Sequence, residues 1–260
     1  MYNIGGILLA VIYGNIQSER LMRKVPFAAI LPSEFENDEK VEPFKTLYLL
    51  HGWNDAFDAW INNTRIVELA TKYNIAVIMP SGENSFYVDL ENGNYYGQYI
   101  GEELVRITRG MFNLSHEFES TWIAGLSMGG YGALRNGLYY NETFSKIGAL
   151  SSKILQSQER DHDLTEENRM NQAIQFIIGA ETYQDMERDK DIFSLAKKNS
   201  IPELFIACGT EDFIYRESLN LHNYLNELKI DHIYKESPGD HSWSFWDHYI
   251  EQVIEWMVSD

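Results

Sequence analysis

Cysteine, basic residues and long apolar runs are all scarce in this chain of 260 residues. Its single cysteine, Cys208, has no partner within the chain for a disulfide bond, which fits a reducing compartment. No apolar run approaches the roughly 20 residues that a transmembrane helix needs. The apolar stretch at residues 7–13 has no basic residue before it and no small-residue cleavage pattern after it, so it predicts a strand and not a signal peptide. We therefore expect a cytoplasmic protein without a membrane anchor.

The charge balance is strongly acidic. The chain has 21 Lys and Arg residues against 39 Asp and Glu residues, which gives a formal net charge of −18. Such a surface repels the phosphates of nucleic acids and the anionic head groups of lipids. Neither nucleic acid nor membrane is therefore expected as a partner, and we interpret the charge as serving solubility.

Motifs for metal and nucleotide chemistry are missing as well. The sequence has no paired spacing of metal ligands such as H-x-x-x-H, and no G-x-x-x-x-G-K-[ST] phosphate loop. We therefore expect neither a metal ion nor another cofactor.

A rhythm of buried strands and helices is present instead. Residues up to about Leu31 alternate and carry β-branched side chains, as in the strands of a meander. Apolar runs without alternation, which are typical of strands buried on both faces, lie at residues 46–50, 75–79, 121–124, 147–150, 204–208 and 232–235. Helical periodicity follows at residues 101–112 and 217–228. The pattern predicts a mostly parallel, doubly wound sheet with helices on both faces and the functional site at the carboxyl ends of the strands.

Residues 153–191 interrupt this rhythm. The segment is polar and charged, with a helical piece around residues 170–178. We interpret it as a small cap or lid-like insertion over the functional face of a single α/β domain that spans residues 1–260.

The strongest motif is Gly125-Leu126-Ser127-Met128-Gly129, between a predicted strand and a predicted helix. This is the G-x-S-x-G nucleophile elbow in the strand–turn–helix context that α/β-hydrolases require. The two glycines leave room for a sharp turn that holds the serine in an unfavourable backbone conformation. The motif predicts Ser127 as a nucleophile at a helix N-terminus, where free N–H groups favour a developing oxyanion.

The elbow requires an acid and then a histidine, in that chain order. Asp212 follows the fifth of the apolar runs and is our candidate acid, with Glu211 as the rival if the register is shifted by one residue. Of the seven histidines, His241 alone lies in a glycine-flanked loop late enough in the chain to close the triad. We predict that its imidazole takes the proton of Ser127 while Asp212 holds the tautomer.

Two backbone N–H groups are expected to form an oxyanion hole. The first belongs to Met128, the residue after the nucleophile, and the second comes from a loop after an earlier strand. His51-Gly52-Trp53 ends the strand at residues 46–50, so Trp53 is the expected second donor and Gly52 its rival. His51 is expected to hold this loop by hydrogen bonding. Gly52, Tyr87 and Trp243 are the expected residues of the substrate pocket.

Three segments carry a family resemblance: Leu49-Leu50-His51-Gly52, the elbow with its helix through Leu134, and His241-Ser242-Trp243-Ser244-Phe245-Trp246. They resemble the esterase D group of α/β-hydrolases, and within it the bacterial tributyrin esterases of the EstA type. The likeness extends from about Ala28 to Trp256. It implies cofactor-independent hydrolysis of short acyl esters by Ser127, Asp212 and His241, and it allows for a homo-oligomer, as in some members of the group.

The substrate is a small-molecule ester, expected to carry an acetyl to butyryl group, with acetylated sugars among the candidates. A feruloyl esterase is an alternative, because abundant aromatic residues could line a pocket for an aromatic acyl group. An S-formylglutathione hydrolase-like thioesterase is another, although those enzymes carry a cysteine in the loop after His-Gly, where this chain has Trp53-Asn54-Asp55. A non-catalytic binding protein with the same fold is a fourth interpretation, and the presence of all three triad residue types argues against it.

Overall fold

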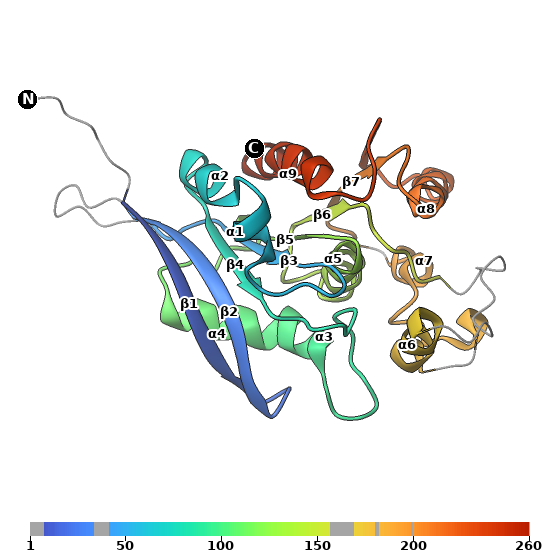
Figure 1. The fold of residues 1–260 in the computed structure, drawn as a ribbon, viewed down its shortest axis with the longest axis horizontal. Helices are drawn as coiled ribbons and strands as arrows, with labels where there is room; N and C mark the ends of the chain where they lie inside the picture. The colour runs from blue at the N-terminus through green and yellow to red at the C-terminus, as the bar shows by residue number, and fades with distance from the viewer. Residues whose placement is uncertain (1–7, 34–41, 157–168, 180–181, 199, 260) are drawn as a thin grey trace, which may run out of the picture.

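An eight-stranded sheet runs through the part of the chain that the computed structural model describes, namely residues 8–33, 42–156, 169–179, 182–198 and 200–259 (Figure 1). The order across the sheet is β1-β2-β4-β3-β5-β6-β7-β8. The β1–β2 and β2–β4 pairs are antiparallel, and every later pair is parallel. The strands are β1 (Leu8–Ser18), β2 (Arg23–Ser33), β3 (Thr46–Leu50), β4 (Ala76–Pro80), β5 (Thr121–Leu126), β6 (Lys146–Leu150), β7 (Glu203–Gly209) and β8 (Ile233–Ser237).

The expected α/β architecture is confirmed. Strands β3, β4, β5 and β6 are buried at every residue, which is why their sequences run apolar without alternation. Strands β1 and β2 form a long hairpin at one edge of the sheet, which agrees with the predicted meander. Strand β8 forms the opposite edge beside β7. The expectation of burial on both faces is wrong for this strand, because an edge strand has one neighbour and its five residues are half-buried or exposed.

Helices cover both faces of the sheet (Figure 1). One apolar core includes residues of α1, α2 and α9, and the other includes residues of α4, α5 and α8. The helices are α1 (Ala59–Asn63), α2 (Ile66–Lys72), α3 (Tyr96–Gln98), α4 (Leu104–Met111), α5 (Met128–Tyr139), α6 (Arg169–Ile178), α7 (Ile192–Leu195), α8 (Tyr215–Glu227) and α9 (Trp243–Val258). Among the residues described, no helix combines the length and apolarity that crossing a membrane would need.

The helix expected at residues 101–112 begins differently from the prediction. A π-helical turn, Tyr99–Glu103, precedes α4, which then runs from Leu104 to Met111. The π-helical turn is tied to the β1–β2 turn through its last residue, Glu103. The buried carboxylate of Glu103 accepts hydrogen bonds from the Ser18 hydroxyl (2.5 Å) and the Glu19 backbone N–H (2.8 Å). That contact joins residues more than 80 positions apart, so helical periodicity alone could not indicate it.

The carboxyl ends of β5, β6, β7 and β8 meet at one edge of the sheet, since these strands are neighbours and parallel. The chain leaves them at Ser127, Ser151, Thr210 and Pro238 respectively. Within the expected insertion at residues 153–191, the structure describes α6 and residues 182–191, while 157–168 and 180–181 lie outside the described residues. Helix α6 of this segment lies beside α7, on the side of the molecule away from the β1–β2 hairpin (Figure 1).

Candidate active site

Ser127 lies in a strained turn between β5 and α5. Its φ of 52° and ψ of −117° lie in a region that costs a non-glycine residue about 1–3 kcal/mol. The turn can close because both flanking glycines lack a Cβ. A Cβ on Gly125 would lie 2.3 Å from the carbonyl oxygen of Gly129, and a Cβ on Gly129 would lie 2.5 Å from that of His51. The elbow therefore needs glycine at both positions.

The structure brings Ser127, His241 and Asp212 into one hydrogen-bonded chain. Ser127 Oγ lies 3.0 Å from His241 Nε2. On the other side of the imidazole, His241 Nδ1 lies 2.8 Å from Asp212 Oδ2 and 3.1 Å from Oδ1. A carboxylate can only accept at Nδ1, so Nδ1 carries the proton and Nε2 is left to accept from the serine hydroxyl.

The environment keeps Asp212 ionised. Burial alone would raise its pKa, but hydrogen bonds from His241 and from the backbone N–H of Ile214 outweigh burial and hold the pKa of Asp212 below its usual value. Glu211, the rival acid, points elsewhere: its carboxylate accepts the backbone N–H of Gly239 at 2.7 Å. Glu211 thereby ties the loop that carries His241 to the end of β7.

The loop after β3 is fixed by His51. Its Nε2 accepts the backbone N–H of Gly82 at 2.9 Å, so its Nδ1 carries the proton and donates to the Gly52 carbonyl at 2.8 Å. Burial lowers the pKa of His51 to about 4, which keeps this imidazole neutral at physiological pH. The Tyr87 hydroxyl completes the fixation by donating to the His51 carbonyl at 2.9 Å.

The expected oxyanion donors lie beside the nucleophile. A Cβ on Gly52 would lie 3.7 Å from the Cβ of Ser127, so this loop approaches the serine closely. Both Trp53 and Met128 line the same cavity as Ser127. Within the described residues, the backbone N–H groups of Trp53 and Met128 donate to no other backbone group. Two such donors beside a serine hydroxyl are what stabilisation of an oxyanion requires.

The cavity beside Ser127 has a volume of about 270 Å³. Its lining is mainly apolar and includes one ion pair; it comprises Trp53, Phe86, Ser127, Met128, Lys153, Ile174, Tyr183, Phe213, Ile214 and Glu217. Ile174 on α6 and Tyr183 both belong to the 153–191 segment, which therefore forms part of the wall.

The expected pocket residues Gly52, Tyr87 and Trp243 are not among the described residues that line this cavity. Tyr87 is fully buried behind it and holds His51. Trp243 packs edge-on against Trp60 and Trp246, on the α1 and α9 side of the sheet. Sequence reasoning missed Lys153, Phe213 and Glu217, and of these Phe213 could have been found because it directly follows the candidate acid.

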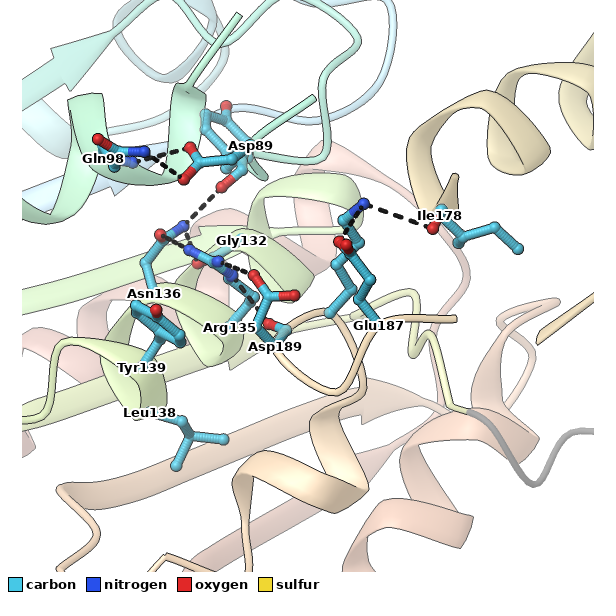
Figure 2. A network of polar contacts seen from close by, with 12 residues as sticks. Asp89, Gln98, Gly132, Arg135, Asn136, Leu138, Tyr139, Ile178, Glu187 and Asp189 are labelled. Atoms are coloured by element: carbon cyan, nitrogen blue, oxygen red, sulfur yellow. Dashed lines mark hydrogen bonds and ion pairs between the residues drawn. The ribbon is translucent and has the colours of Figure 1, made fainter. Parts of the chain in front are cut away.

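A polar network connects the 153–191 segment to the helix that begins after Ser127 (Figure 2). The Arg135 side chain, on α5 and 1% exposed, forms an ion pair with the Asp189 carboxylate and donates to the Asp189 carbonyl at 3.0 Å. Arg135 also donates to Asn136, whose amide donates to the Tyr87 carbonyl at 3.0 Å. Since Tyr87 holds His51, the network extends from the 153–191 segment to the loop after β3.

A second branch of this polar network holds the C-terminal end of α6. The buried ammonium of Lys190 lies 3.0 Å from the Glu187 carboxylate and donates to the carbonyl of Ile178, the last residue of α6, at 3.4 Å (Figure 2). The Tyr131 hydroxyl on α5 donates to the Lys190 carbonyl at 2.6 Å.

Within the described residues there is no cluster of three His, Cys, Asp or Glu side chains that could hold a metal ion.

The sheet order, the elbow and the serine–histidine–acid arrangement are the features that define an α/β-hydrolase. The sequence profile of the Esterase family, described as "Putative esterase", matches residues 18–257, and the chain belongs to this family. The protein is therefore a carboxylic ester hydrolase.

Three known proteins are similar along nearly the whole chain. An acetyl esterase of Caldicellulosiruptor saccharolyticus is 40% identical over 97% of this chain and 100% of its own. The solved structure of FphF, a fluorophosphonate-binding serine hydrolase of Staphylococcus aureus, has a TM-score of 0.86 at 32% identity and covers 97% of this chain and 99% of its own. The S-formylglutathione hydrolase FrmB of S. aureus has a TM-score of 0.83 at 31% identity, over 97% of this chain and 100% of its own.

Proposed function

We propose that the protein hydrolyses short-chain acyl esters, from acetyl to butyryl, through an acyl-enzyme on Ser127. The observation that carries this proposal is the hydrogen-bonded chain from Ser127 through His241 to Asp212 beside a cavity of about 270 Å³. The 40% identity to an acetyl esterase supports the short acyl group. The resemblance to the esterase D group agrees with the same activity.

The proposed reaction has two halves. Ser127 Oγ attacks the ester carbonyl carbon while His241 Nε2 takes its proton, and the backbone N–H groups of Trp53 and Met128 stabilise the oxyanion. The imidazolium, held by Asp212, then gives the proton to the leaving alkoxide, and the alcohol departs. In the second half a water molecule replaces Ser127 as attacking group, and the same proton transfers release the carboxylic acid and the free serine.

We propose that the segment 153–191 forms a cap within a single α/β-hydrolase domain. Ile174 and Tyr183 come from this segment and line the cavity, so its packing sets the space for the acyl group. Together with Trp53 and Phe86, they place four large side chains around this space. We expect acetyl to butyryl esters to be preferred over octanoyl esters for this reason.

A thioesterase of the S-formylglutathione hydrolase type is the second candidate. The structural likeness to FrmB, at 31% identity, favours it. The oxyanion loop carries Trp53 after His51-Gly52, in place of the cysteine expected for that activity. S-formylglutathione therefore belongs in the substrate panel, and so does a ferulate ester, because Phe86 and Phe213 in the cavity wall could face an aromatic acyl group.

The test combines a covalent probe with this panel. A fluorophosphonate should add one adduct mass to the wild-type protein and none to Ser127→Ala. That variant should lose on the order of 10⁶ in kcat. Values of kcat/KM for p-nitrophenyl acetate, butyrate, octanoate and ferulate and for S-formylglutathione should be highest for acetate or butyrate. Persistent labelling of Ser127→Ala, or a higher kcat/KM on octanoate than on butyrate, would contradict the proposal.

A further inference from the structure

An ion pair lies in the wall of the cavity that contains Ser127. Lys153 follows β6 and Glu217 lies in the first turn of α8, and Lys153 Nζ is 2.6 Å from Glu217 Oε1. The Lys153 backbone N–H donates to the carbonyl of Ser127 at 3.2 Å, so the lysine is anchored directly to the nucleophile. Both charged side chains line the same cavity as the reacting serine.

Stability alone does not explain a charged pair at this position. The side chains of Lys153 and Glu217 are only 13% and 12% exposed, and their neighbours in the wall include Ile174 and Ile214. Taking two charges out of water costs several kcal/mol per ion, and apolar residues of similar volume commonly stabilise a fold as well or better. A pair retained in an otherwise apolar cavity therefore points to recognition of a polar group.

The pair keeps unused hydrogen-bonding capacity. An ammonium has three N–H donors, and among the described residues Glu217 is the one recorded acceptor for Lys153 Nζ. The Glu217 carboxylate accepts from Lys153 and, through Oε2, from the Ile154 backbone N–H at 2.7 Å, which leaves further lone pairs free. A donor and an acceptor thus lie side by side on the cavity wall.

We propose that Lys153 and Glu217 form a polar subsite that binds a hydroxyl group of the ester substrate. A hydroxyl accepts from the ammonium and donates to the carboxylate at the same time, whereas a substrate carboxylate would be repelled by Glu217. The cavity is small, so this hydroxyl lies only a few bonds from the scissile carbonyl, in either the acyl or the alcohol part. This inference rests on the proposed esterase function and adds a substrate class to it.

The experiment compares matched esters that differ in one hydroxyl. The acyl arm pairs p-nitrophenyl 3-hydroxybutyrate with p-nitrophenyl butyrate, and the alcohol arm pairs 2-hydroxyethyl acetate with propyl acetate. In one of the two arms the wild-type kcat/KM should favour the hydroxylated ester by about tenfold, and that arm identifies the part of the substrate that carries the hydroxyl. Lys153→Met should bring the ratio of the two kcat/KM values close to one, and Glu217→Gln should lower it.

The matched control is Lys72→Met. Lys72 also pairs with a glutamate, Glu251, at 2.7 Å, but on the exposed surface between α2 and α9. This variant should keep the wild-type ratio. A ratio near one in both arms for the wild type overturns the subsite, and so does a ratio that survives Lys153→Met. The first of these outcomes can be measured even if both cavity variants fail to fold. If the wild type hydrolysed none of the four esters, the esterase proposal would be overturned, and the subsite with it.

Discussion

Asp212 and Glu211 are neighbours in the chain, yet the fold gives them different tasks. The carboxylate of Asp212 accepts from His241 Nδ1, and that of Glu211 accepts the backbone N–H of Gly239. A tight turn at the end of β7 separates the two directions, since the Asp212 backbone N–H donates to the Gly209 carbonyl at 3.1 Å. One carboxylate therefore orients the imidazole, and the other holds the loop that carries it.

Replacing Asp212 with Asn should preserve the fold and reduce kcat on the order of 10⁴-fold, because the histidine loses the acceptor that fixes its tautomer. Glu211→Gln is the matched control and should lose far less, since it only weakens a loop contact. Steady-state kinetics on p-nitrophenyl acetate, with circular dichroism to verify folding, measure both effects. The assignment of the acid would be reversed if Glu211→Gln were the more damaged enzyme.

The sequence predicts which residues are triad candidates better than it predicts what each side chain contacts. The triad candidates follow from the strand–turn–helix motif and the chain order of the partners, both of which are local. The Lys153–Glu217 pair joins residues 64 positions apart, so no local pattern indicates it. The directions of Tyr87 and Trp243 depend on which core each ring enters, and this too is decided by distant contacts.

At the scale of elements, strands β3 to β6 are predictable because a fully buried strand has a continuous apolar sequence. Their ends were also close to the prediction, since glycine or polar turns follow the sheet edge. The helices α4 and α8 were found by periodicity, whereas the π-helical turn before α4 depends on the tie between Glu103 and the β1–β2 turn. Long-range polar ties of this kind set element boundaries that propensity cannot.

Helix α5 and the 153–191 segment are joined by the Arg135–Asp189 ion pair. Asp189→Asn leaves a buried guanidinium without its counter-charge. The free energy of unfolding should fall by about 2 kcal/mol, below the 3–5 kcal/mol of a fully buried pair because the Asp189 side chain is 31% exposed. Urea denaturation measures this loss.

Asp247→Asn is the control for this change. It removes one of the two ion-pair partners of the exposed Arg65 side chain and leaves the other, Glu251, in place, so it should have the smaller effect. Equal losses of unfolding free energy in the two variants would mean that the buried Arg135–Asp189 pair stabilises the fold no more than an exposed pair does.

The stability of the whole molecule should depend on His51 in acid. Burial lowers the pKa of His51 from the usual 6.5 to about 4, so between these values the unfolded chain binds a proton that the folded chain does not. The contribution of neutral, buried His51 is therefore complete above pH 6.5 and is lost as the pH falls toward 4. The loss of this contribution between pH 7 and pH 4.5 amounts to about 2–3 kcal/mol.

Urea unfolding at pH 7 and pH 4.5 tests this dependence. His51→Gln should show a fall in unfolding free energy smaller than that of the wild type by about the same 2–3 kcal/mol. His248→Gln changes an exposed histidine on α9 and should keep the wild-type fall. An unaltered fall in His51→Gln would place the acid sensitivity in other groups, with His222 the first to consider because burial also lowers its pKa from the usual 6.5.

The position of β8 at the edge of the sheet determines when the molecule becomes an enzyme. Ser127 takes up its conformation with β5 and β6 in the middle of the sheet, but its base arrives on the loop after β8, the last strand to be synthesised and the outermost on that side. A growing or refolding chain whose β8 has not yet paired with β7 holds a nucleophile without a base. We therefore expect esterase activity to appear no earlier than the pairing of β8 with β7, so that its appearance during refolding would report that this edge of the sheet has formed.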